Sequence, residues 1–213
     1  MIRYFSYGAK EMDCLSKRCK KMGKVIAEVG LIRRRINPDP FAALVSSVIS
    51  QQISGKGAAT IQQRLLDKCG KATPCVIAAL SPEEIQACGM SMRKATYIQG
   101  IAEAALNGSL DTSKLDRMTD QELIDSLIRL KGVGIWTAQM LMIFSLGRQD
   151  ILSWLDLGIR KGLQILYNYP EVSREQFEKQ RKKYSPYGSV ASLYLWHLAG
   201  QAQTSKYSAR QSR

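Results

Sequence analysis

A short glycine-containing turn is the most chemically informative feature of the sequence. Residues 130–135 (Leu-Lys-Gly-Val-Gly-Ile) stand between two stretches whose apolar residues recur at helical spacing. Glycine lets a ligand approach the backbone closely, and the first amides of a helix carry the positive end of its dipole. The amides of Gly132, Val133 and Gly134, with Lys131 beside them, can therefore bind a phosphate oxygen without contacting a base.

The same turn also fits a plain connection between two helices, for which glycine is equally suited. The residues alone leave both interpretations open. A dinucleotide-binding Gly-x-Gly-x-x-Gly motif is disfavoured, because no strand is predicted before the turn and no third glycine follows in place.

Helix start signals recur along the chain, whereas the alternation typical of strands is scarce. Asp39-Pro40 is the pattern of a helix N-cap followed by a first helical residue, and apolar residues continue at helical spacing to Ile49. Further helices are expected after capping boxes at Ser81, Thr119 and Ser173, and over 135–146, from about 157, and over 189–198. The sequence therefore predicts an all-α fold.

The composition favours a polyanionic partner. Lysine and arginine number 31 against 18 acidic residues, which gives a formal charge of +13 in 213 residues. Nucleic acid is the first partner to consider, although a cationic surface also suits anionic membranes or solubility alone. No signal peptide or membrane-spanning segment is recognisable, so we expect a cytoplasmic protein, nucleoid-associated if it is bacterial, without membrane contact.

The five cysteines form no Cys-x-x-Cys pair, which argues against a zinc ribbon or a disulfide framework. None follows Cys88, so the C-terminal half has no thiolates to hold an iron–sulfur cluster. We expect neither a metal nor another cofactor.

The domain organisation is expected to be simple. No repeat or low-complexity linker is visible, so residues 1–213 are interpreted as one structural unit with a core over about 37–200. Residues 201–213 are polar and basic and lack an apolar stripe, which predicts a mobile tail unless DNA orders it. A monomer is expected.

Several linked motifs resemble one known family. They are the run from Leu130 to Ala138 with the apolar helix after it, 147–150 (Gly-Arg-Gln-Asp), 156–163 (Asp-Leu-Gly-Ile-Arg-Lys-Gly-Leu), Phe41-x-x-Leu44 leading to 51–54 (Gln-Gln-Ile-Ser), and 186–196. In this order and spacing the chain, over roughly 37–200, resembles the helix-hairpin-helix (HhH-GPD) DNA glycosylases, and among them the alkylpurine (3-methyladenine) DNA glycosylases.

The resemblance implies two helical lobes with a central cleft that holds a flipped base, and a catalytic carboxylate at Asp156. Hydrolysis of an N-glycosidic bond passes through a sugar with oxocarbenium character, which a nearby carboxylate stabilises. An Asp immediately before an apolar stretch is also typical of an N-cap, and the two roles are compatible. Asp150 is the rival carboxylate, interpreted as a solvated loop residue or a cap.

The resemblance also implies a monofunctional enzyme that leaves an abasic site. Family members that cut the backbone carry a lysine nucleophile two residues after the second glycine, where this chain has Trp136. Trp136 and Trp196 correspond to aromatic residues at the base pocket, and Trp154 is a further local candidate. An aromatic face suits a cationic alkylated purine, although each tryptophan could equally be a core residue.

The remaining roles concern DNA. The resemblance places Gln52 at the wedge that fills the gap left by the flipped base, although a Gln-Gln pair also suits an exposed helix end. Arg148 is expected to join Lys131 and the turn amides in binding the backbone of duplex DNA that contains damaged bases.

The sequence departs from the family pattern at Leu155, Gly188, Met140 and Leu157, which leaves the substrate range open. The alternatives are a glycosylase for an oxidised or deaminated purine, and a non-catalytic helix-hairpin-helix DNA-binding module.

Overall fold

A computed structural model describes residues 2–211, without the side chains of 203–211. In chain order its elements are β1 (Arg3–Tyr4), α1 (Ala9–Arg18), α2 (Lys20–Val29), β2 (Arg35–Ile36), α3 (Pro40–Ser50), α4 (Gly55–Cys69), α5 (Pro74–Ala78), α6 (Pro82–Gln86), α7 (Met92–Leu106), the 3-10 helix η1 (Leu115–Arg117), α8 (Asp120–Leu127), α9 (Ile135–Phe144), α10 (Leu157–Tyr167), α11 (Arg174–Tyr184) and α12 (Gly188–Gln211). The predicted all-α class is confirmed, with two-residue β1 and β2 forming a small sheet.

The chain divides into two compact units. The first unit comprises Met1–Arg35 and Gly147–Arg213, and the second comprises Ile36–Leu146. The first unit is therefore built from both ends of the chain, with the second inserted between them. Whether the two fold as one domain, as the sequence analysis expects, stays a prediction.

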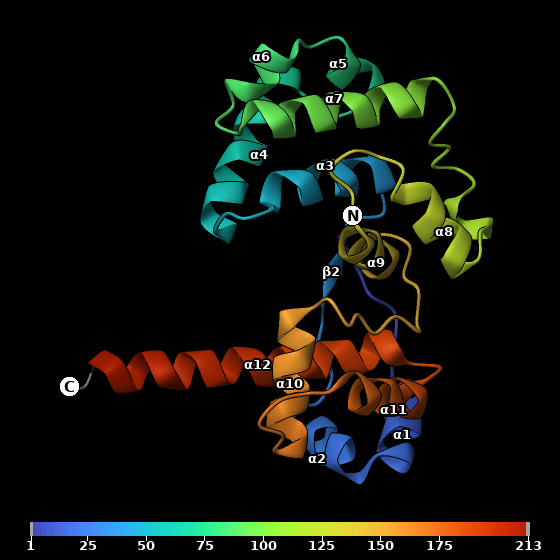
Figure 1. The fold of residues 1–213 in the computed structure, drawn as a ribbon, viewed down its shortest axis with the longest axis vertical. Coiled ribbons are helices and arrows are strands. Elements are labelled where there is room, and N and C mark those ends of the chain that lie inside the picture. Colours follow the sequence, from blue (N-terminus) through green and yellow to red (C-terminus); the bar gives the residue numbers. More distant parts are fainter. Residues whose placement is uncertain (1, 212–213) are drawn as a thin grey trace. The chain divides into compact units, whose positions relative to one another are not determined.

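In the first unit, α12 packs against α10 and also against α2 and α11 (Figure 1). The core includes Leu15, Met22, Ile159, Leu163, Phe177, Tyr184 and Tyr194, all almost completely buried. Gly162 allows a close contact between α10 and α12. A Cβ atom on this residue would lie 2.7 Å from Cα of Leu195, so only glycine fits here without a shift of the backbone.

In the second unit, α7 packs against α3, α5 and α6, and α9 packs against both α3 and α8 (Figure 1). The core includes Leu44, Val48, Ile49, Ile98, Ile101, Leu127, Met142 and Ile143. Helices α3 and α9 thus share one core, which fixes the side chains on their other faces relative to one another.

The helix start signals in the sequence are confirmed. The Asp39 side chain accepts a hydrogen bond from the Ala42 amide, and capping boxes start α6, α8 and α11. Helix α8 ends at Leu127, and the Leu130 N–H bonds to the Leu127 carbonyl oxygen where the glycine turn begins.

Helix α12 continues to Gln211, well past Leu198, where the sequence analysis places its end. No proline and no glycine after Gly200 interrupts it. The prediction of a mobile tail over 201–213 falls largely on residues and side chains outside the described part of the chain. Among the described residues, no helix combines the length and apolar character needed to span a bilayer.

Candidate functional site

The glycine turn of the second unit connects α8 to α9 in a hairpin whose two glycines have different surroundings. Gly132 has a left-handed backbone with φ of +87°, and a Cβ atom there would lie 2.8 Å from Cγ of Tyr97. Gly134 is the N-cap of α9, and a Cβ on it would meet nothing within 4 Å. Gly132 therefore packs inward, whereas Gly134 leaves open space in front of the first amides of α9.

The residues predicted to bind the DNA backbone differ in the solvent exposure of their side chains. Lys131 is exposed, but Val133 is buried, so Val133 could contribute to phosphate binding only through its main chain. Arg148 belongs to the first unit, where its carbonyl oxygen accepts a hydrogen bond from the Ser189 hydroxyl (2.6 Å). The hairpin thus carries Lys131 and the turn amides, and Arg148 is a separate basic group.

The turn after α3 is fixed to the hairpin by side chains. Gln51 Nε2 donates to the Gly132 carbonyl oxygen at 2.8 Å. Lys94 Nζ donates to the carbonyl oxygens of Ile49 (2.8 Å) and Gln51 (2.5 Å), which places a positive charge at the C-terminal end of α3. Burial lowers the pKa of Lys94, and repulsion from Arg93 acts in the same direction.

Gln52 follows directly in this turn with φ of +58°, an uncommon left-handed conformation for a residue with a side chain. It is exposed. Such backbone strain costs roughly 1 kcal/mol and persists where the surrounding structure holds it. The bonds of Lys94 and Gln51 provide that support, so Gln52 is presented from a fixed turn, as a wedge residue would need to be.

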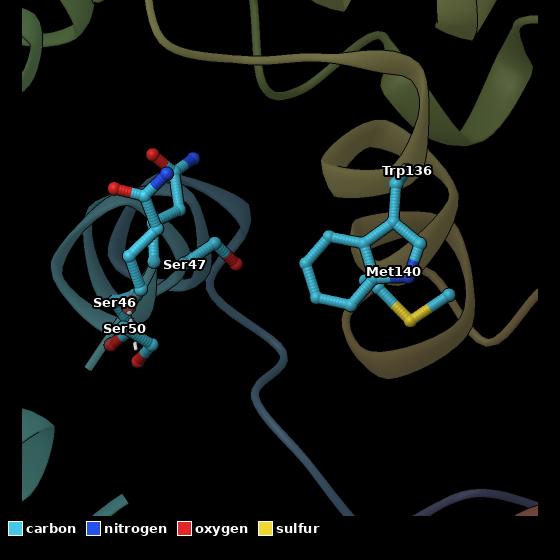
Figure 2. A pocket seen from close by; sticks show the side chains of 7 residues that line it. Ser46, Ser47, Ser50, Trp136 and Met140 are labelled. Atoms are coloured by element: carbon cyan, nitrogen blue, oxygen red, sulfur yellow. Dashed lines mark hydrogen bonds between the residues drawn. The ribbon is translucent and has the colours of Figure 1, made fainter. Parts of the chain in front are cut away.

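A groove of about 490 Å³ lies between α3 and α9 of the second unit. On the α9 side, Trp136 and Met140 stand one helical turn apart (Figure 2). Trp136 is 40% exposed. The α3 side and the following turn contribute polar side chains: Ser46, Ser47, Ser50, Gln51 and Gln52. The structure therefore brings together two of the predicted residues, Trp136 and Gln52.

The predicted catalytic residue Asp156 and the tryptophans Trp154 and Trp196 are in the first unit, where Asp156 begins α10. Its Oδ1 accepts hydrogen bonds from the Ile159 amide (2.8 Å) and from Trp196 Nε1 (2.9 Å). Asp156 is 7% exposed. The N-cap geometry expected from the sequence is thus present, and the indole of α12 holds the same oxygen.

Gly158 makes this arrangement possible. A Cβ on Gly158 would lie 2.8 Å from Trp196 Cδ1 and 3.1 Å from Asp156 Oδ1. Both distances are shorter than ordinary van der Waals contact, so the absence of a side chain lets the indole reach the carboxylate. Leu155 and Leu157, on either side of Asp156, are 51% and 72% exposed. The carboxylate therefore sits between exposed apolar side chains.

The Trp154 ring is packed by an aromatic ring and two arginine side chains. Its ring meets Phe177 edge-on at 5.2 Å, and the guanidinium groups of Arg160 and Arg174 lie 5.0 and 5.1 Å from its centre. These contacts give Trp154 a packing role in the first unit. Its place in a base pocket stays a prediction.

Asp150 stands at the start of α12. It accepts hydrogen bonds from the Ser185 hydroxyl (2.5 Å) and from the Gly188 amide (3.0 Å). Its capping role, one of the two expected from the sequence, is confirmed. Asp150 is therefore a useful matched control for Asp156.

Several residues of the site escaped the sequence analysis. Ser46, Ser47 and Ser50 lie at helical spacing on the otherwise apolar α3, a pattern that marks one polar stripe and could have identified a lined groove. No sequence pattern could have linked Lys94 to the site, because its partners Ile49 and Gln51 lie more than forty residues away in the sequence.

The helical fold, the glycine hairpin and the capping carboxylate are the features of a base excision DNA repair protein. Residues 45–186 match the HhH-GPD superfamily of base excision DNA repair proteins, and the chain belongs to this family.

Individual relatives resemble the chain over most of its length. DNA-3-methyladenine glycosylase 1 of Schizosaccharomyces pombe is 32% identical over 90% of this chain and 86% of its own. The crystal structure of a DNA-3-methyladenine glycosidase from Bacillus halodurans superimposes with a TM-score of 0.84 at 35% identity, covering 95% of this chain and 94% of that one. A Schizosaccharomyces pombe 3-methyladenine DNA glycosylase in complex with abasic DNA gives a TM-score of 0.78 at 32% identity, over 88% and 95%.

Proposed function

We propose that this protein is a DNA glycosylase that hydrolyses the N-glycosidic bond of alkylated purines, of the 3-methyladenine and 7-methylguanine type, in duplex DNA. The observation that carries the proposal is the setting of Asp156 at the start of α10. One oxygen of its carboxylate, Oδ1, accepts two hydrogen bonds. The three relatives named above are 3-methyladenine glycosylases or glycosidases, which supports the substrate class.

The chemistry follows from the leaving group. An alkylated purine carries a positive charge and departs as a neutral base, while positive charge develops on the sugar ring. A fixed carboxylate stabilises that charge and orients the attacking water. Because Ile159 N–H and Trp196 Nε1–H both bond to Oδ1, the Asp156 carboxylate is held in one orientation before the substrate arrives. It then needs little reorganisation during the reaction.

The damaged base needs a place outside the helical stack. Flipping a nucleotide out of duplex DNA costs a few kcal/mol, and weakly stacked or damaged bases cost least. The groove of the second unit offers the exposed Trp136 ring, and a cation over an aromatic face gains about 1–2 kcal/mol. In this proposal the exposed Gln52 enters the gap left by the base.

In this proposal the hairpin binds the DNA backbone. The amides in front of α9, with Lys131 beside them, suit a phosphate oxygen. The family resemblance places Trp136 at the position of the lysine nucleophile of lyase-type members, so in this proposal the product is an abasic site in an uncut strand.

A panel of defined duplexes tests the proposal. Duplexes with 3-methyladenine, 7-methylguanine, 8-oxoguanine or hypoxanthine are incubated with the wild-type protein, and base release is read by mass spectrometry. We expect release of the two alkylated bases, and strand breaks only after alkali treatment. Release of 8-oxoguanine alone, or salt-sensitive binding with every lesion left intact, would refute the proposal in favour of another lesion or a binding module.

A further inference from the structure

The groove between α3 and α9 has two chemically different walls, and we infer that Ser47 on α3 determines its specificity by hydrogen bonding to the edge of the extruded purine. This inference rests on the proposed function, because it names a hydrogen-bonding group within the same base pocket.

The α9 wall binds the base without reading its edge. It consists of the Trp136 ring and the Met140 side chain, which is 8% exposed. Aromatic rings and thioethers are polarisable and hold the face of a flat ligand. A wall of this kind attracts any purine, and a cationic one most strongly. It does not distinguish the nitrogen and oxygen atoms around the ring.

The α3 wall carries hydroxyl groups instead. The Ser50 hydroxyl donates to the Ser46 carbonyl oxygen within its own helix at 2.8 Å. Ser47 points across the groove toward Trp136, whereas Ser46 is grouped with Ser50 (Figure 2). Within residues 2–211, outside the tail side chains, the half-buried Ser47 hydroxyl has no hydrogen-bond partner. It is therefore available to a ligand.

The other polar groups of the groove are bonded or lie away from Trp136. The Ser46 hydroxyl also has no hydrogen-bond partner in the described part of the chain, but Ser46 lies beside Ser50 rather than toward Trp136 (Figure 2). The Gln51 amide nitrogen bonds to the Gly132 carbonyl, and Gln52 belongs to the strained turn beyond the end of α3. Ser47 is thus the hydroxyl best placed to pair with a base lying against Trp136.

A serine hydroxyl can either donate or accept a hydrogen bond. Purines differ at their edges: guanine presents the O6 acceptor where adenine presents the N6 donor. One rotating hydroxyl can pair with either group. Ser47 therefore lets the groove accept alkylated adenine and alkylated guanine, while a purely apolar wall would leave the edge of either base without a partner.

The test compares Ser47→Thr with Ser47→Val, because threonine and valine have nearly the same shape and differ in the hydroxyl. Single-turnover release of 7-methylguanine and of 3-methyladenine is measured at saturating enzyme, with Ser47→Ala alongside. Thr96→Ala is the control, since Thr96 is an exposed residue of α7 whose hydroxyl bonds only to the Met92 carbonyl of its own helix. Urea unfolding verifies that each variant folds.

We expect Ser47→Ala and Ser47→Val to lose about five- to tenfold in rate on both lesions, the effect of one neutral hydrogen bond. Ser47→Thr stays within about twofold of wild type, and Thr96→Ala is unchanged. Equal rates for Ser47→Thr and Ser47→Val in an active enzyme would overturn the inference alone. A wild-type protein that releases neither base would overturn the proposed function, and this inference with it.

Discussion

Replacing Gly158 by alanine perturbs the carboxylate without removing any of its partners. The new Cβ would stand 2.8 Å from Trp196 Cδ1, 3.3 Å from its Nε1 and 3.1 Å from Asp156 Oδ1. Because the first distance is too short for two carbon atoms, the indole must move, and its 2.9 Å hydrogen bond to Asp156 lengthens or breaks.

The magnitude follows from the bond that is lost. A hydrogen bond to a charged group contributes about 1.5–3 kcal/mol, and each 1.36 kcal/mol changes a rate tenfold. If the bond stabilises the transition state, Gly158→Ala should slow base release by about 10- to 150-fold. DNA affinity should change by less than about twofold, because the hairpin lies in the other unit.

The assay combines rate, stability and structure. Single-turnover release of 7-methylguanine gives the rate, and the indole N–H resonance of Trp196 in a nitrogen-15 spectrum reports the hydrogen bond. Gly100→Ala is the matched control, since Gly100 lies within α7 and a Cβ there would meet nothing within 4 Å. Gly158→Ala with a wild-type rate and a displaced Trp196 resonance would refute the reasoning that the indole positions the carboxylate.

Three further changes have defined outcomes. Gly162→Ala places a Cβ 2.7 Å from Cα of Leu195 and should lower the free energy of unfolding by about 1–3 kcal/mol, measured in urea; unchanged stability would contradict the close contact of α10 and α12. Lys94→Met removes two hydrogen bonds to the end of α3 and should lower the free energy of unfolding by about 1–3 kcal/mol in the same assay. A decrease of less than about 0.5 kcal/mol, within the usual range of a surface substitution, would show that these bonds contribute little. Gln52→Ala should slow release of a base from duplex DNA more than from a single strand, which has no stack to refill; equal effects on both would exclude a wedge role.

Much of the fold can be predicted from the sequence, because the signals that start helices and form turns are local. Each of these signals depends on residues within four positions of one another: the Asp39 cap, the capping boxes of α6, α8 and α11, and the glycine turn. The end of α12 was missed because the sequence after Gly200 lacks an apolar stripe but contains nothing that stops a helix.

The site was only partly predictable, because its decisive contacts join distant residues. The N-cap geometry of Asp156 follows from its place before an apolar stretch, but the bond from Trp196 spans forty residues. Trp154 shows that closeness in the sequence is also a poor guide to the site. It is near Asp156 in sequence, yet its ring is packed by Phe177 and two arginines, which no spacing rule reveals.

The central claim is that the negative charge of Asp156 drives base release, and one comparison of two variants tests it. Asp156→Asn keeps an oxygen to accept from Ile159 and Trp196 but removes the charge, and Asp150→Asn makes the same change at the cap of α12. In single-turnover reactions on 7-methylguanine duplexes, we predict that Asp156→Asn is slower than wild type by at least about a hundredfold. Asp150→Asn should stay within about threefold. Equal rates for Asp156→Asn and the wild-type enzyme would contradict the account.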